Sequence, residues 1–304
     1  MKGDIKKTAT VSEMHYNMGL EPPKHPLITV IDTQYVEVSA EEVGSKLISD
    51  LYLIAIKDKN CGMEYGRNAL DFSEGAMVFS APGQVYTPSR EIAAGEVEGW
   101  LLYFHPDLLY DTHLGSIIDQ YSFFNYDVYE ALHLSAEEER TINDCVDNIK
   151  NEYNQRIDSH SKKVIVSNLE LLLTYAQRFY ERQFHTRSSQ SKDVVAAFEK
   201  ELKAYYRESR ALDDGLPNIQ QFAAQANLSQ HYFSDLIKKE TGRSPKDHIN
   251  DFIVEKAKNM LLATESSVSE IAYDLGFNYP HYFTRLFKSR TGKTPVAYRS
   301  LHPN

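Results

Sequence analysis

An internal repeat in the last third of the chain limits its fold more than any other feature. Residues 219–245 read IQQFAAQANLSQHYFSDLIKKETGRSP, and residues 268–295 read VSEIAYDLGFNYPHYFTRLFKSRTGKTP. Nine positions are identical, Phe233/Phe283 among them, at an offset of 49 residues before the central turn and 50 after it. Self-similarity of this kind indicates that one supersecondary unit occurs twice.

Each copy contains the signals of two short helices joined by a tight turn. Asn218 and Ser267 are residues that favour the N-cap of a first helix. Asn227 and Gly276 tolerate the left-handed conformation of a sharp turn. A glycine at the end of each copy fits the residue just past a second helix. The repeat therefore predicts two helix-turn-helix units, at about 218–242 and 267–292.

The second copy continues as GFNYPHYFTRLFKSRTGKTPVAYR and resembles the DNA-binding domain of the AraC/XylS family of bacterial transcription regulators. The resemblance extends over residues 195–304. It implies an all-α domain whose two motifs are joined by a long helix and place their second helices in successive major grooves. The partners it implies are double-stranded promoter DNA and RNA polymerase. Activation and repression stay equally open.

The residues that would contact DNA are those on the exposed face of each second helix, which is the face opposite its apolar residues. The first helix then presents Gln230, His231, Ser234, Asp235 and Lys238. The second helix presents Pro280, His281, Tyr282, Arg285 and Lys288, with Thr284 beside them. Base readers usually lie in the N-terminal part of such a helix, and an arginine can bind guanine O6 and N7.

Three more basic residues, Arg243, Arg290 and Lys293, are predicted phosphate contacts that position the protein without reading sequence. Family members often carry a basic residue where this chain has Asp235, and a carboxylate repels phosphate. This departure keeps open a second interpretation, in which the chain is a protein–protein adaptor with degenerate motifs. Tyr232 and Tyr282 have a competing assignment as core residues, because each precedes the phenylalanine of a buried face.

The first half of the chain has the sequence pattern of a β domain. Short apolar runs at 27–38, 47–56, 76–79 and 99–104 are separated by turn clusters, which is typical of a sandwich or barrel. The resulting fold class is α+β and multidomain, with a cupin-like β barrel or jelly roll and a helical extension ahead of the all-α domain. Ser135 and Glu138 predict a capping box at the start of that extension.

The expected domain boundaries lie where the sequence pattern changes between strands, helices and polar segments. We expect a flexible arm at 1–24, a cupin-like effector domain at 25–110, a helical extension at 111–186, a linker at 187–194 and the DNA-binding domain at 195–304. The extension either packs on the barrel or forms the seam of a homodimer, because an apolar stripe does not identify its partner.

A small-molecule effector is expected in the β domain, since pockets are mostly apolar with a few polar groups. Its candidate lining residues are Tyr52, Tyr65, Tyr86, Trp100 and Tyr103. A cupin-type enzyme is the less favoured alternative: no histidine lies between His25 and His105, so a metal site lacks its usual ligands. No cofactor or catalytic residue is predicted.

The formal net charge of −10 argues at first against a nucleic-acid partner, but it is unevenly distributed. Residues 190–304 hold 16 basic and 14 acidic residues, which leaves a net −12 for the rest. No acidic residue follows Asp274, so DNA binding through a local basic patch is predicted. The chain has two cysteines, Cys61 and Cys145, which lie far apart in sequence. It has no apolar run near the ~18 residues of a membrane span. Both features are typical of a cytoplasmic protein.

Overall fold

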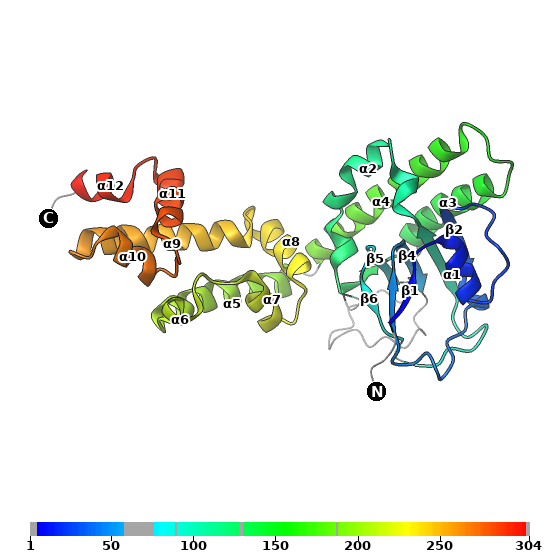
Figure 1. Cartoon of the computed structure of the whole chain (residues 1–304), viewed down its shortest axis with the longest axis horizontal. Helices are drawn as coiled ribbons and strands as arrows, with labels where there is room; N and C mark the ends of the chain where they lie inside the picture. Colours follow the sequence, from blue (N-terminus) through cyan, green and yellow to red (C-terminus); the bar gives the residue numbers. More distant parts are fainter. Residues whose placement is uncertain (1–4, 58–75, 89, 128–129, 187, 302–304) are drawn as a thin grey trace. The chain divides into compact units, whose positions relative to one another are not determined.

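The computed structural model describes residues 5–57, 76–88, 90–127, 130–186 and 188–301. The chain divides into two compact units, Met1–Thr186 and Arg187–Asn304. Unit 1 combines β-sheets with helices, whereas helices are the only regular secondary structure in the described residues of unit 2 (Figure 1). The expected change from a mixed α/β region to a helical domain is therefore present.

Two sheets are formed by the described residues of unit 1. The larger sheet is antiparallel and has the order β2 (Ile28–Asp32), β7 (Gly99–Phe104), β4 (Tyr52–Lys57), β5 (Ala76–Ser80) and β8 (Leu132–His133). The smaller sheet has the order β1 (Ile5–Thr8), β3 (Lys46–Ser49) and β6 (Val85–Tyr86). Strand β1 runs parallel to β3, and β6 runs antiparallel to it.

The larger sheet is open in the described residues, so the expected closed barrel is not formed. Its edge strand β2 meets α3 (Ala136–Tyr153), where the Tyr153 hydroxyl lies 3.3 Å from the Val30 nitrogen and 3.4 Å from the Val30 oxygen. A side chain thus covers backbone groups that another strand would pair with in a barrel. The jelly-roll topology stays a prediction.

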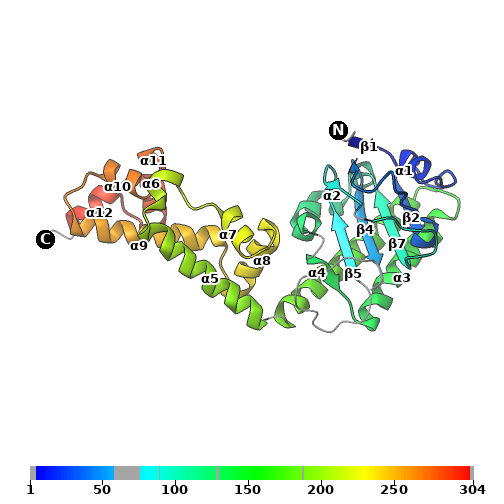
Figure 2. The same ribbon diagram turned by 90° about the horizontal axis from the view of Figure 1, so that it is seen from below.

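Helices α3 and α4 (Ser161–Thr186) cover one face of the larger sheet (Figure 2). Trp100 of β7 donates a hydrogen bond from Nε1 to Asn143 of α3, at 2.8 Å. Phe79 of β5 packs on Tyr180 of α4 with ring centroids 6.1 Å apart. The helical extension is therefore an integral part of unit 1. The apolar faces of α3 and α4 pack on the larger sheet.

The opposite face of the larger sheet is covered by the N-terminal segment. Val11 and Met14 of α1 (Val11–Asn17) are buried in one cluster with Ile31, Leu101 and Tyr103. The expected flexible arm at 1–24 is therefore wrong from residue 5 onward. The strand β1 finds its partner β3 some forty residues later in the chain, and local composition carries no sign of such pairing.

Short elements connect the strands and helices of unit 1. They are the 3₁₀ turns Thr33–Tyr35, Pro106–Leu109, Ile118–Gln120 and Ser122–Asn125 and the helix α2 (His113–Ile117). The predicted capping box is confirmed, since Ser135 and Glu138 exchange hydrogen bonds at the start of α3. Cys145 is buried in that helix, and Cys61 lies outside the described residues.

Unit 2 is built around α9 (Pro245–Ala263). Figures 1 and 2 show α7 (Ile219–Gln225) and α8 (Gln230–Thr241) at one end of α9. The remaining helices, α10 (Val268–Asp274), α11 (Pro280–Thr291) and α12 (Pro295–Leu301), pack along the rest of α9. Two helices precede the motifs, α5 (Ser188–Arg207) and α6 (Arg210–Asp214), so most of the interval 187–194 expected as a linker is helical.

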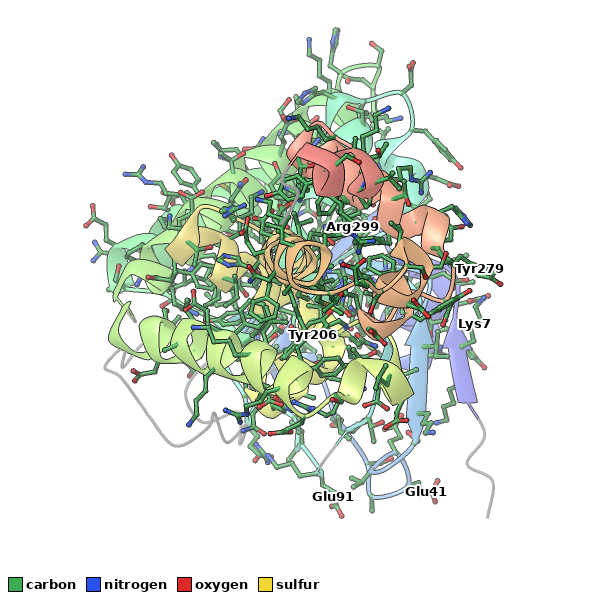
Figure 3. The ribbon with its side chains drawn as sticks, turned by 90° about the vertical axis from the view of Figure 1, so that its left-hand side faces the viewer. Lys7, Glu41, Glu91, Tyr206, Tyr279 and Arg299 are labelled. Atoms are coloured by element: carbon green, nitrogen blue, oxygen red, sulfur yellow. The ribbon has the colours of Figure 1, made fainter. Side chains whose placement is uncertain are left out.

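Tyr206 of α5 joins three parts of unit 2. Its ring packs on Phe252 of α9 at 5.4 Å between centroids, and it lies between α5 and α9 in Figure 3. Its hydroxyl donates to the Leu275 carbonyl in the turn before α11, at 3.3 Å. Burial raises the pKa of this hydroxyl above its ordinary value, so it remains a donor at any physiological pH.

Candidate nucleic-acid interface

The turn of each helix-turn-helix motif is closed by the same backbone hydrogen bond. The Leu228 nitrogen donates to the Ala223 carbonyl at 2.9 Å, and the Phe277 nitrogen donates to the Ala272 carbonyl at 3.0 Å. Both alanines are buried, where a larger side chain would separate the crossing helices. Asn227 and Gly276 adopt φ values of +54° and +92°, as the turn chemistry predicted.

The ends of the second helices also repeat. Gly242 follows α8 and Gly292 follows α11 in the left-handed conformation, and each nitrogen donates to a lysine carbonyl four residues earlier, at 2.8 and 2.9 Å. Thr241 and Thr291 each donate to the carbonyl four residues earlier and accept from a backbone nitrogen two residues later. The predicted ends of both motifs are therefore confirmed.

The outward face of α8 carries the residues expected for motif one. Gln230, His231 and Lys238 are exposed, and Ser234 and Asp235 are half-buried. The Ser234 hydroxyl donates to the Gln230 carbonyl at 2.7 Å, which leaves its lone pairs to accept from a base. Phe233 and Ile237 fill the opposite, buried face as expected.

The outward face of α11 carries the residues expected for motif two. His281, Tyr282, Arg285 and Lys288 are exposed, and Pro280 is half-buried at the first helical position. The His281 and Tyr282 rings lie 4.1 Å apart, and the Arg285 guanidinium lies over the Tyr282 ring at 5.3 Å. Thr284 is half-buried on the same helix.

A residue that sequence reasoning missed completes this aromatic cluster. Tyr279, the N-cap of α11, is 60% exposed, and its ring lies 5.8 Å from that of His281 and 6.1 Å from that of Tyr282. Figure 3 shows it at the outer edge of unit 2. An exposed tyrosine directly before the helix was the available signal, since caps normally carry small polar residues.

The two motifs differ at one of their identical positions. Tyr232 is 5% exposed, whereas Tyr282 is 47% exposed. Helix α8 packs against α5, where Phe198 meets Phe233 edge-on at 5.5 Å between centroids. Helix α11 packs instead against α9, α10 and α12. The core assignment therefore holds for Tyr232, while the Tyr282 ring is available to a partner.

The predicted phosphate contacts separate into paired and exposed residues. Arg290 of α11 forms ion pairs with Asp247 and, at 3.5 Å, with Asp251, and Arg243 is also paired with Asp251. Lys293 is exposed beyond α11. Phosphate contact by Arg243 and Arg290 stays a prediction, and it would compete with these aspartates of α9.

The Asp247 carboxylate is held in its ionised form. The Ser244 hydroxyl, followed by the Arg290 guanidinium, lowers the pKa of Asp247 below its ordinary value. Arg299 of α12 is likewise engaged, donating to the Leu261 carbonyl at 3.0 Å and the Ser266 carbonyl at 2.7 Å. Figure 3 shows Arg299 between α12 and α9. Contacts between residues more than thirty positions apart thus hold the first turn of α9 to α11 and its last turn to α12.

The residues expected to line an effector pocket do not meet in one place. Tyr52 and Trp100 lie on the helix-covered face of the larger sheet, where Tyr52 stacks on Phe104 at 4.8 Å. Tyr103 lies on the other face, in the cluster with α1. Tyr65 lies outside the described residues, and only the backbone of Tyr86 is described. One pocket formed by all five residues is therefore contradicted.

Neither metal ligands nor membrane spans are found in the described ranges. No group of three or more histidine, cysteine, aspartate or glutamate side chains is close enough there to hold a metal ion. None of the helices in the same ranges combines the length and apolar composition that a bilayer crossing requires.

Residues 222–300, which include α8 to α11, match the model of a helix-turn-helix domain family. The chain is 31% identical over 154 residues to YfiF of Bacillus subtilis, an uncharacterised HTH-type transcriptional regulator, covering 50% of this chain and 45% of that protein. The C-terminal unit is an AraC-type helix-turn-helix domain. This AraC-type domain therefore accounts for the repeat.

Other similar proteins include the MmsAB operon regulatory protein of Pseudomonas aeruginosa, 35% identical over 81 residues, or 27% of this chain and 26% of that protein. Among solved structures, the C-terminal domain of AraT, a response regulator from Geobacillus stearothermophilus, is 30% identical. That match covers 36% of this chain and 84% of the AraT domain, with a TM-score of 0.32. The chain spans less than half of the length of the curated relatives named here.

Proposed function

We propose that this chain is a transcription regulator that binds double-stranded promoter DNA through α8 and α11. The carrying observation is the doubled helix-turn-helix unit, in which both second helices present polar or aromatic side chains outward while their phenylalanines are buried. A helix of this kind fits the major groove with its N-terminal residues against base edges. RNA polymerase is the expected further partner.

The roles of individual residues follow from their places on the two helices. His281, Arg285 and Lys288 of α11, and Gln230, His231 and Lys238 of α8, are exposed and free to approach bases or phosphates. Asp235 contributes a carboxylate to motif one, which favours a cytosine N4 donor and opposes a phosphate. We therefore assign more of the phosphate attraction to motif two.

The test is selection of duplex DNA from a random pool by the full chain, followed by fluorescence anisotropy with the selected duplex. We expect the combined variant His281→Ala and Arg285→Ala to lose affinity by tenfold or more, since one good bidentate contact contributes about 1–3 kcal/mol. Lys163→Ala removes one exposed positive charge from α4 of unit 1 and serves as the matched control. Equal affinities of the three proteins would refute the assignment of α11.

Salt dependence separates this proposal from the adaptor alternative. Each neutralised phosphate contributes a slope of about −0.9 to the plot of log K against log salt. We expect a clearly negative slope that becomes less steep in Lys288→Ala. No selected duplex and a slope near zero would instead favour a protein–protein adaptor.

We further propose that unit 1 controls the DNA-binding unit through a small-molecule effector or through homodimerisation. The support is that unit 1 has its own core and its own sheet faces, separate from the AraC-type domain. Trp100, the one tryptophan of the chain, reports on unit 1 alone. A metabolite supports the effector proposal if it raises the midpoint of thermal unfolding of unit 1, followed by Trp100 fluorescence, and also changes the affinity for DNA. Sedimentation velocity tests the dimer.

A further inference from the structure

We propose that α11 reads a guanine flanked by a thymine, through Arg285 and Tyr282 acting together. This proposal rests on the proposed function and adds which bases motif two selects. It starts from the exposed aromatic cluster Tyr279, His281 and Tyr282 at the N-terminal end of α11, with ring centroids 4.1 to 6.1 Å apart. Exposed aromatic side chains gathered in one place, in contrast to apolar side chains scattered singly over a surface, are typical of a binding surface.

Arg285 is oriented by this cluster and stays available. Its guanidinium lies over the Tyr282 ring at 5.3 Å. Arg285 follows Tyr282 by three positions, which places the two side chains on the same face of the helix. No carboxylate lies within ion-pairing distance of it in the described part of the chain, unlike Arg290 one turn further on. A guanidinium stacked on a ring keeps its edge donors free, and its orientation is partly fixed before binding.

The bases follow from the chemistry of the major groove. Guanine presents two acceptors there, O6 and N7, which match the fork of a guanidinium, and thymine alone among the four standard bases presents a methyl group. The exposed face of the Tyr282 ring offers the apolar contact that such a methyl group needs. Because the two side chains are neighbours, the two bases they read are neighbours as well.

Motif one lacks this pair at the equivalent positions. Tyr232 is buried, and Asp235 stands where motif two has Arg285. The two halves of the DNA site therefore differ in sequence, although the two motifs are repeats of each other. The guanine–thymine pair belongs to the half that α11 contacts.

Single-atom changes in the selected duplex test the proposal. Deoxyuridine in place of thymine removes only the methyl group, and we expect binding to weaken about three- to fivefold, the effect of one buried methyl group. Deaza substitution at guanine N7 removes one acceptor, and we expect a loss of about fivefold or more. The sensitive positions should be adjacent.

Variants assign each sensitivity to its side chain. Tyr282→Ala should abolish the effect of deoxyuridine, whereas Tyr282→Phe, which keeps the ring, should retain it. Arg285→Ala should abolish the effect of the guanine analogue. His231→Ala in α8 is the control, because it leaves α11 untouched and both effects should persist. Both tested side chains are exposed, so we expect the variants to fold. Circular dichroism is the measurement that checks this.

The outcomes distinguish this inference from the proposed function. A selected duplex whose binding ignores both analogues, or whose deoxyuridine effect persists in Tyr282→Ala, overturns the base assignment and leaves DNA binding established. Failure to select any duplex overturns both.

Discussion

Gly276, in the turn of motif two, is a position where one added carbon meets packed backbone. Its φ of +92° is a conformation that side chains rarely adopt. A Cβ there would lie 2.6 Å from both the carbonyl carbon and the oxygen of Gly215, and 3.0 Å from the Leu216 nitrogen. All of these are backbone atoms, so the segment after α6 would have to move.

The expected cost of Gly276→Ala has two parts. The left-handed conformation costs a non-glycine residue about 1 kcal/mol or slightly more. Displacing packed backbone adds about 1–3 kcal/mol. The move would also disturb the Gly215 carbonyl, which accepts a hydrogen bond from the Tyr205 hydroxyl at 3.0 Å. We therefore expect unit 2 to lose about 2–4 kcal/mol of unfolding free energy.

Gly292 is the matched control for this change. Its φ is +77°, and nothing lies within 4 Å of an added Cβ, so Gly292→Ala should show only the conformational cost of about 1 kcal/mol. With a urea slope of about 1.5 kcal/mol per M, the midpoint should fall by about 1.3–2.7 M for Gly276→Ala and about 0.7 M for Gly292→Ala.

Urea unfolding of the full chain, followed with two probes, measures the difference. Circular dichroism at 222 nm follows the helices, and Trp100 fluorescence follows unit 1 only. The midpoint reported by Trp100 should stay unchanged in both variants. Equal shifts for the two glycines would refute the steric reasoning, and a shift of the Trp100 midpoint would refute the independence of the units.

Three further perturbations have expected outcomes. Arg182→Met breaks a bidentate pair in which Nε and Nη2 of Arg182 lie 2.7 and 2.9 Å from the Glu138 carboxylate; we expect a loss of about 2 kcal/mol in the Trp100 transition, and no loss would contradict it. A double-mutant cycle of Arg290→Gln and Asp247→Asn should give a coupling of about 0.5–1 kcal/mol, because the two side chains are 32% and 41% exposed, and additivity would exclude their pairing. Burial lowers the pKa of His25, whose Nδ1 accepts from the Leu27 nitrogen, so the neutral ring is the stable form. Unit 1 should be most stable above pH about 6.5 and lose stability as pH falls through that value toward the lower folded pKa, and His25→Asn should flatten this slope.

Local chemistry explains which parts of unit 2 were predictable. The caps, the turn at Asn227 and the glycines after α8 and α11 depend on residues within five positions of one another, and all are confirmed. The ion pair of Arg290 with Asp247 joins residues 43 positions apart, and it could not be read from the chain. The same holds for β1, whose partner is β3.

The effector-pocket assignment failed for a reason that the sequence did contain. Trp100 and Tyr103 are three positions apart on one strand, and side chains of a strand alternate between faces. They were therefore bound to lie on opposite faces once β7 formed. The choice of residues by type alone ignored this alternation, whereas the subtraction of a buried helix face, which respects periodicity, placed His281 and Arg285 correctly on the exposed side.

The charge distribution acquires a different meaning once the partners of each cation are known. Five basic residues follow Asp274, but Arg290 is held by two aspartates and Arg299 by two backbone carbonyls. Arg285, Lys288 and Lys293 are the remaining exposed cations of that segment. With Arg285 assigned to a base, Lys288 and Lys293 leave two phosphate contacts in this segment, which correspond to a salt slope of only about −1.8, well below that of a strongly electrostatic binder. With so little attraction from the charges of this segment, and a net −12 in residues 1–189 opposing it, the proposed promoter binding would have to depend on contacts with the bases themselves. That requirement gives the exposed rings of α11 their importance.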